Sequence, residues 1–244
     1  MRILARISEE SYDSIKPGYY HHAMLHGGNL VRFWHRNKFR KAIECVGSFK
    51  GKKILDLGCG PGSLISLLPE GYQRAVGVDF SRRQIEFAKR NFRSKKIDWV
   101  NRRIEDARFD KGNFDVIFMI EVLEHIPMEK NRRIFAKIFG LLKKKGKFVM
   151  TTPNYRSLWP IIEFFWSRMK PVDYREQHIN RFDIPKIKSE LESAGFINIR
   201  IKTIFFVSPF FGILFPKLAE RMMDIEEKLF PGLGALIVAE AEKK

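Results

Sequence analysis

The side chains most suited to catalysis or metal binding follow an apolar segment near the middle of the chain, in the sequence EVLEH at positions 121–125. Offsets of three and four residues would place Glu121, Glu124 and His125 on one side of a helical turn, where they could bind one divalent cation such as magnesium. His178, in the later sequence EQHINRF, could complete this metal site. The same residues also allow His125 to act as a general base without a metal, or to have only a structural role. All three interpretations stay open at this point.

A second informative stretch is KILDLGCGPGS, in which an apolar run stops at a glycine-rich turn. The glycines of this turn are Gly58, Gly60 and Gly62. Their spacing is G-x-G-x-G, whereas dinucleotide-binding proteins have G-x-G-x-x-G, and this difference weakens a pyrophosphate interpretation. Asp79 ends the next apolar run, 23 positions after Asp56, where a carboxylate can accept hydrogen bonds from both hydroxyls of a ribose. The pattern predicts a nucleoside site rather than a turn without a ligand.

The elements that must position these residues alternate between strands and helices. Five apolar runs are predicted as strands, at residues 53–57, 73–79, 97–101, 114–120 and 147–152. Ser81-x-x-Gln84 has the form of a capping box that opens a helix through Asn91, and apolar residues at helical spacing indicate a second helix before Gly146. A further helix after Asp183 and strands at 197–206 and 235–241 complete the chain. The alternation predicts a doubly wound, mainly parallel α/β sheet with ligands at the carboxyl ends of its strands.

The glycine turn and Asp79 together resemble motif I and the following acidic position of class I S-adenosylmethionine-dependent methyltransferases. The resemblance extends from about Lys53 to Gly195, and it includes the segment FDVIFMIEVLEH and the pair Gly195-Phe196. It implies a Rossmann-like sheet of seven strands, S-adenosylmethionine as cofactor and methyl transfer as the activity.

The resemblance also implies which residues hold the cofactor. The glycine turn would pass under the methionine part, Asp79 would hold the ribose, and Ile120 would lie against the adenosine. Arg103 stands where the family often has an aspartate for the adenine amino group, so this contact would fall to Glu105, Asp106 or the backbone of Ile104. The implied cofactor-binding residues are Asp56, Gly58, Cys59, Gly60, Gly62, Asp79, Phe80, Ile104, Glu105 and Ile120.

The motif EVLEH with a distant histidine resembles two methyltransferase groups that use magnesium or a similar ion. These are the ubiquinone-pathway O-methyltransferases and the small-RNA terminal 2′-O-methyltransferases. Other methyltransferases have a Glu-His pair after the same strand and need no metal. The resemblance therefore assigns catalytic roles to Glu121, Glu124 and His125, and it leaves the cation open.

Composition and length indicate the number of domains, the kinds of partner and the cellular location that we expect. The chain has 244 residues, which suits one domain, and we expect residues 1–50 to form a helical cap and residues 153–182 and 207–232 to roof the site. A formal net charge of +17 favours RNA, anionic lipid headgroups or acidic small molecules as partners, although a lysine-rich surface is also common in heat-adapted proteins. The chain has only two cysteines and no apolar leader, so we expect a cytoplasmic protein. It has no run of about 20 apolar residues, so we expect no transmembrane segment.

Aromatic residues in the two roofing segments suit a flat ring system or an acyl or isoprenoid chain. We therefore predict methyl transfer to a hydroxyl of a small or lipophilic molecule, with peripheral membrane contact left open. The first alternative is an RNA ribose 2′-O-methyltransferase, because of the charge and the metal-like motif. A non-catalytic cofactor-binding partner protein is the second, and the reactive residues at positions 121, 124 and 125 argue against it.

Overall fold

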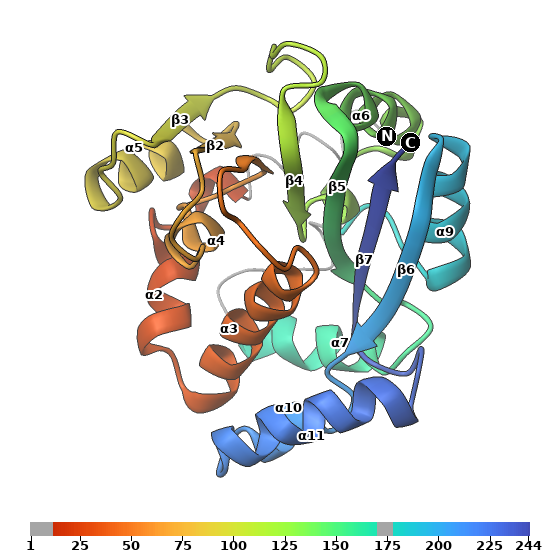
Figure 1. The fold of residues 1–244 in the computed structure, drawn as a ribbon. Helices are drawn as coiled ribbons and strands as arrows, with labels where there is room; N and C mark the ends of the chain where they lie inside the picture. The colour runs from red at the N-terminus through yellow and green to blue at the C-terminus, as the bar shows by residue number, and fades with distance from the viewer. Residues whose placement is uncertain (1–11, 170–177) are drawn as a thin grey trace.

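The sheet of this protein has seven strands in the order β3-β2-β1-β4-β5-β7-β6 (Figure 1). The computed structural model describes residues 12–169 and 178–244, with only the backbone of residues 165–169. β7 is antiparallel to both of its neighbours, and the other pairs of adjacent strands are parallel. The strands are β1 Lys53–Leu57, β2 Arg74–Asp79, β3 Ile97–Asn101, β4 Phe114–Ile120, β5 Leu142–Pro153, β6 Phe196–Ile204 and β7 Leu236–Lys243. The prediction of a doubly wound, mainly parallel α/β fold is confirmed.

Helices cover both faces of the sheet because its central strands are apolar on both sides. Leu55 of β1 packs into a buried cluster with Ile138 of α6 and Ile187 of α9. Ile54, the residue before it, points to the other face, where it shares a cluster with Phe39 of α3. The helices are α2 Tyr19–His26, α3 Asn29–Glu44, α4 Ser63–Ser66, α5 Arg82–Asn91, α6 Met128–Leu141, α7 Trp159–Met169, α9 Ile184–Ser193, α10 Ser208–Phe211 and α11 Pro216–Leu229, with a 3-10 helix η1 at Leu123–His125.

The start of α5 departs from the prediction. Ser81 lies at the N-cap, but the capping box does not form, because its Oγ donates to Asp13 Oδ1 at 2.6 Å. Gln84 Oε1 accepts a hydrogen bond from the backbone amide of Gly18 at 3.0 Å. Both polar groups therefore tie the N-terminal segment to α5 and do not cap the helix.

A third buried cluster joins the C-terminal helices to the N-terminal cap. Phe33 and Trp34 of α3 pack there with Trp159 of α7 and with Ala219 and Met223 of α11. Within the described part of the chain, each helix is too short or too polar to cross a bilayer.

Candidate functional site

The glycine turn lies between β1 and α4, and all three of its glycines have positive φ angles. A Cβ atom on Gly58 would lie 2.4 Å from a methyl carbon of Val122, and one on Gly62 would lie 2.5 Å from the ring of Trp99. Gly60 differs, because the nearest atom to its Cβ position is the hydroxyl oxygen of Tyr12 at 3.1 Å. Gly60 and Tyr12 both line a cavity, and without a side chain at Gly60 a ligand can approach its backbone closely.

Two buried carboxylates follow this turn at the carboxyl ends of β1 and β2. Asp79 accepts hydrogen bonds from the backbone amides of Gly60 at 2.8 Å and Ser81 at 2.9 Å. Burial raises its pKa to about 6, although these amides and the Tyr12 hydroxyl act in the opposite direction. Asp56 is also buried, and its Oδ2 has no hydrogen-bond partner among the described residues. Burial and the neighbouring Asp79 raise the pKa of Asp56 to about 8.

Such carboxylates suit a ligand that brings hydroxyl donors and positive charge. The nucleoside diol and the charged sulfur of S-adenosylmethionine match this requirement, so the residues present fit the implied cofactor. Asp56 and Asp79, both predicted to bind the cofactor, line the cavity.

The predicted adenine side lies at the ends of β2 and β3. Phe80, Ile104 and Glu105 line the cavity, and the guanidinium of Arg103 lies 5.8 Å from the centre of the Phe80 ring. Glu105 Oε1 accepts from Lys130 Nζ at 2.7 Å. Of the ten residues predicted to bind the cofactor, nine line the cavity. Gly62 does not, because it turns the chain into α4, and Asp106 is also absent from the lining.

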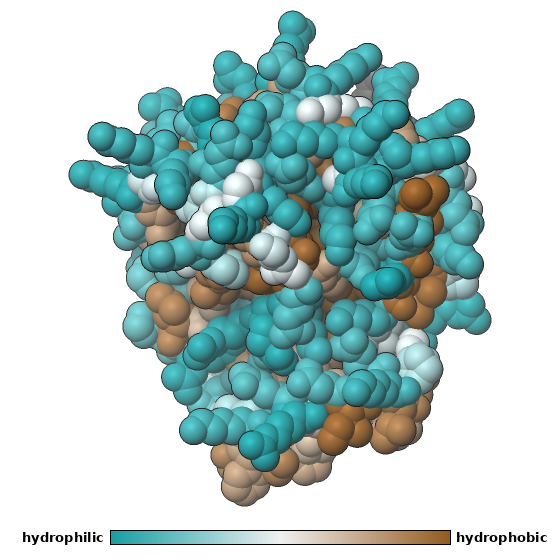
Figure 2. Space-filling view, viewed as in Figure 1, coloured by the Kyte–Doolittle hydropathy of each residue, from teal (hydrophilic) through white to brown (hydrophobic). Residues whose placement is uncertain are grey.

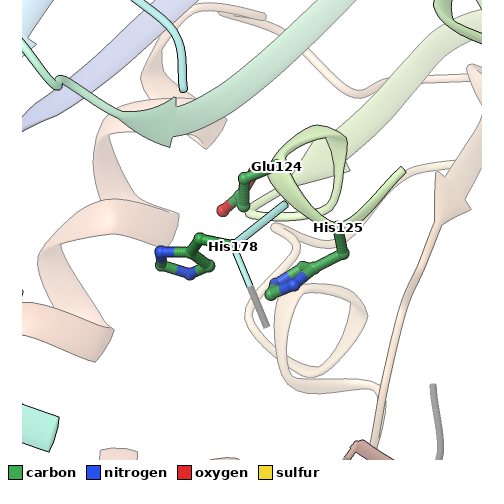
Figure 3. Close-up of side chains that lie close together, drawn as sticks. All are labelled: Glu124, His125 and His178. Carbon is green, nitrogen blue, oxygen red and sulfur yellow. The ribbon is translucent and has the colours of Figure 1, made fainter. Parts of the chain in front are cut away.

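The motif EVLEH lies directly after β4, and four of its five residues line the same cavity. Figure 3 shows Glu124 and His125 beside His178. Glu124, His125 and His178 each offer one ligand atom, and these atoms lie within 4.8 Å of one another. Glu121 is not in this group. The expected helical turn is the short helix η1, which begins after Glu121, and the Glu121 carboxylate forms an ion pair with Lys38 instead. Of the four predicted metal ligands, the structure therefore brings together Glu124, His125 and His178 but not Glu121.

Glu124 is fully buried, and its surroundings leave one oxygen unused. Thr152 Oγ1 donates to Glu124 Oε2 at 3.0 Å, whereas Oε1 has no partner among the described residues. Burial raises the pKa of Glu124 to about 7, and the positive potential of nearby His178 acts against this shift. A cation or a protonated imidazole beside Oε1 would satisfy this carboxylate.

His178 is held in place by residues that the sequence analysis did not single out. Its Nδ1 donates to Glu163 Oε1 at 2.6 Å, and the Tyr155 hydroxyl donates to the same oxygen at 2.8 Å. The backbone amide of Asn180 donates to the carbonyl of Glu124 at 3.1 Å, which fixes this segment beside η1. Local sequence gives no signal for Glu163, because a single glutamate on an apolar helix does not reveal its partner.

Another part of the cavity wall is aromatic and aliphatic. It is formed by Tyr20, Trp34, Phe39, Trp159 and Ile162. These residues come from α2, α3 and α7, so the N-terminal cap and the segment 153–182 both contribute. Segment 207–232 contributes no lining residue, contrary to expectation. The physical reason is that β6 is an edge strand, separated from β5 by β7, so that the following helices pack on the flank of α3.

Comparison with known proteins identifies the family. Residues 32–201 match the family model described as a methyltransferase domain. The ubiquinone biosynthesis O-methyltransferase of Coxiella burnetii is 33% identical over 117 residues, which are 47% of this chain and 49% of the relative. The chain thus matches about half the length of this curated relative. The juvenile hormone acid O-methyltransferase of Bombyx mori is 27% identical over 75% of this chain and 74% of the relative.

Solved structures show the same fold. A methyltransferase structure from Thermotoga maritima, described as a possible histamine N-methyltransferase, has a TM-score of 0.68 and 18% sequence identity. The match covers 97% of this chain and all of that one. Because the family model spans well over half of the sequence, the chain belongs to the methyltransferase domain family and is a class I S-adenosylmethionine-dependent methyltransferase.

Proposed function

We propose that this enzyme methylates an oxygen atom of a small lipophilic acceptor, with His178 as the group that accepts the proton. One observation carries the proposal: His178, held by Glu163, lies in the wall of the same cavity as Asp56 and Asp79. The relatives from Coxiella burnetii and Bombyx mori are both O-methyltransferases, which supports oxygen as the methyl acceptor.

The part of the cavity around Asp56, Gly60 and Asp79, called the cofactor half, would bind the hydroxyl donors and the positive charge of S-adenosylmethionine. When bound, the cofactor supplies a methyl group activated by a positively charged sulfur. Asp79 would accept from the ribose hydroxyls, and the backbone at Gly60 would allow the ligand to approach closely. The buried carboxylate of Asp56 would be stabilised by nearby positive charge.

The part of the cavity around His125, Trp159 and His178, called the acceptor half, would bind and deprotonate a hydroxyl of the acceptor. Because the carboxylate of Glu163 accepts from Nδ1 of His178, the basic atom of this imidazole is Nε2. The hydroxyl proton would pass to Nε2, and the charge of Glu163 would stabilise the imidazolium that forms. Glu163 is therefore a positioning residue. The His125 ring, with its centre 5.1 Å from that of His178, lies beside this path.

The aromatic wall would orient the acceptor and exclude water. Trp34 and Trp159 are both buried, with their ring centres 5.6 Å apart. Flat apolar surfaces of this kind suit a ring system or an extended hydrocarbon chain. Methyl transfer by direct displacement depends on alignment of the two reacting atoms, which such a wall promotes.

A divalent cation is the second candidate for the acceptor half. The observation that favours it is the unused oxygen of buried Glu124 beside ring nitrogens of His125 and His178. Such a mixed set of ligands would favour manganese, iron or zinc over magnesium. The RNA ribose alternative gains no support from the relatives.

The experiment is a methyl-transfer screen with labelled cofactor against phenolic compounds, a lipid extract and total RNA. We expect labelling of phenolic or lipid hydroxyls, and this activity should persist in chelator. Glu163→Gln should lower kcat mainly at neutral pH and recover part of the rate at high pH, where the acceptor ionises by itself. Glu70→Gln, which changes an exposed carboxylate, is the matched control.

Two results would refute the proposal. Exclusive labelling of RNA would refute the acceptor class. Loss of all transfer in chelator, with restoration by one divalent cation, would replace the base mechanism by the metal mechanism.

A further inference from the structure

The C-terminal helices carry an exposed apolar surface that lies apart from the cavity. We call its members the α10–α11 patch, and they surround the turn between the two helices and continue past α11. Leu214 is 74% exposed, Leu229 is 65% exposed and Phe215 is 58% exposed. The patch consists of Phe210, Phe211, Ile213, Leu214, Phe215, Leu218, Ile225, Leu229, Phe230 and Leu233. Figure 2 shows apolar side chains gathered over this lower end of the molecule.

The sequence of α11 explains why one helix has both a buried and an exposed apolar side. Ala219, Met223 and the aliphatic stem of Glu226 face inward and are buried. Leu218, Ile225 and Leu229 recur at spacings of seven and four, which places them together on a neighbouring side of the helix. This second apolar stripe is exposed, and a group of large exposed apolar side chains is typical of an interaction surface.

Most of the acidic side chains of α11 form hydrogen bonds with the rest of the protein. Asp224 and Glu227 accept from Lys41 of α3 at 2.6 and 2.8 Å. Glu226 accepts from the backbone amides of Val207 and Ser208 at the start of α10. Three of the four acidic side chains are therefore engaged within the protein.

The basic side chains of α11 are exposed. They are Lys217, Arg221 and Lys228, and helical geometry places all three on one side, next to the exposed apolar stripe. Glu220 and Asp224 are the exposed acidic residues of α11, and Asp224 is paired with Lys41 and Arg40 of α3. The outward surface of α11 thus combines large apolar side chains with a basic border, in a chain with a formal net charge of +17.

We infer that the α10–α11 patch docks on the surface of a bilayer that contains anionic lipids. Apolar side chains would enter the boundary between headgroups and acyl chains, and the basic border would meet the headgroup phosphates. A second copy of the chain fits less well, because a two-fold interface would bring the same basic border of each copy together. The inference does not depend on which acceptor the enzyme uses.

Docking of this kind would bring the lipid surface close to the wall of the cavity. Trp159 of α7 lies in the same buried cluster as Ala219 and Met223 of α11. On α7, Ile161 is exposed while Ile162 lines the cavity. A lipophilic acceptor would then have a short path from the bilayer to the site.

The test measures binding of the 244-residue chain to vesicles of phosphatidylcholine alone or with 30% phosphatidylglycerol, a composition chosen for the assay. We expect binding to the anionic vesicles that remains in part at high salt, because inserted apolar side chains are not screened. Leu214→Glu should weaken binding at least about tenfold, because it removes an inserted side chain. Ile197→Glu, at the far end of β6, makes the same change of charge and should bind as the wild type does.

A second pair of variants separates the basic border from the overall positive charge. Lys217→Glu/Arg221→Glu should weaken binding at least about tenfold, because each basic residue near an anionic surface adds attraction. Arg132→Glu/Arg133→Glu changes the same amount of charge on exposed positions of α6, a helix that lies away from α10 and α11 in Figure 1, and should have a much smaller effect.

Two outcomes would overturn the inference. Equal losses in each variant and its control would show that net charge alone drives binding. A dimer in solution that Leu214→Glu dissociates, without vesicle binding, would show that the patch joins two copies. Circular dichroism and thermal unfolding establish that each variant is folded.

Discussion

Replacement of Glu124 by glutamine removes one buried negative charge and keeps the shape of the side chain. Glu124 is fully buried, and Thr152 donates to only one of its oxygens. Burial raises the pKa of this carboxyl from 4.5 to about 7, and Glu121 adds to the shift while His178 opposes it. The ionised form is therefore disfavoured in the folded protein.

The size and the sign of the effect follow from this shift. At about 1.4 kcal/mol per pKa unit, the shift corresponds to about 3 kcal/mol. Since the folded state binds the proton more tightly, the wild type loses this stability as the pH rises from about 4.5 to about 7. Glutamine does not titrate. We expect Glu124→Gln to differ little from the wild type at pH 5 and to unfold roughly 6 °C higher at pH 8.

Thermal unfolding at both pH values, in chelator, measures this prediction. Glu70→Gln, at an exposed position, should show no pH-dependent difference. A Glu124→Gln variant that is less stable than the wild type at pH 8 in chelator would refute the reasoning from burial. Stabilisation of the wild type by an added divalent cation, and not of the variant, would support a metal at Glu124.

The remaining predictions concern the cofactor half and the ion pair at the cavity wall. Asp79→Asn should weaken binding of S-adenosylhomocysteine by about 2 to 3 kcal/mol, measured by calorimetry. The reason is that charge-assisted hydrogen bonds are lost and that an amide group faces the backbone donors of Gly60 and Ser81. Unchanged affinity would exclude Asp79 from the cofactor site. Gly60→Val should abolish cofactor binding, because a branched side chain would stand in the cavity at a positive φ angle, and circular dichroism should still show a folded sheet. Lys38→Met should lower the free energy of unfolding by about 1 kcal/mol, because Glu121 loses its partner while its carboxylate keeps some contact with solvent; an unchanged urea midpoint would contradict this.

The sheet and most of the cofactor half could be predicted from the sequence because both depend on local patterns. The bounds of β1, β3 and β4 match the prediction at both ends, since each is a short apolar run between turn signals. The glycine turn and Asp79 lie at the ends of adjacent strands, so the topology alone brings them together. β5 begins at Leu142, earlier than predicted, because Leu142 pairs with Phe114 of β4, and the residues between Leu142 and Lys147 form an irregularity in this pairing.

The acceptor half could be predicted only in part, because its geometry depends on contacts between distant segments. The spacing of EVLEH correctly brought together Glu124 and His125, but a helical turn was the wrong model for Glu121, which has a φ angle of 53°. Lys38 binds Glu121 from a helix 83 residues earlier in the chain. Glu163 and Tyr155 hold His178 from the segment after β5. Sequence spacing contains no information about such partners.

The two halves of the cavity therefore have different structural origins, and this difference bears on specificity. Residues predicted to hold the cofactor lie mainly at the ends of strands, where the hydrogen-bonded register fixes their positions relative to one another. Residues predicted to handle the acceptor lie on α3, η1, α7 and the segment at His178, which are joined by side-chain contacts such as Glu163 to His178. Substitutions in these contacts can reshape the acceptor wall without disturbing the sheet. Acceptor choice should therefore respond to changes in α3 and α7, whereas cofactor affinity should respond to changes at the ends of β1 and β2.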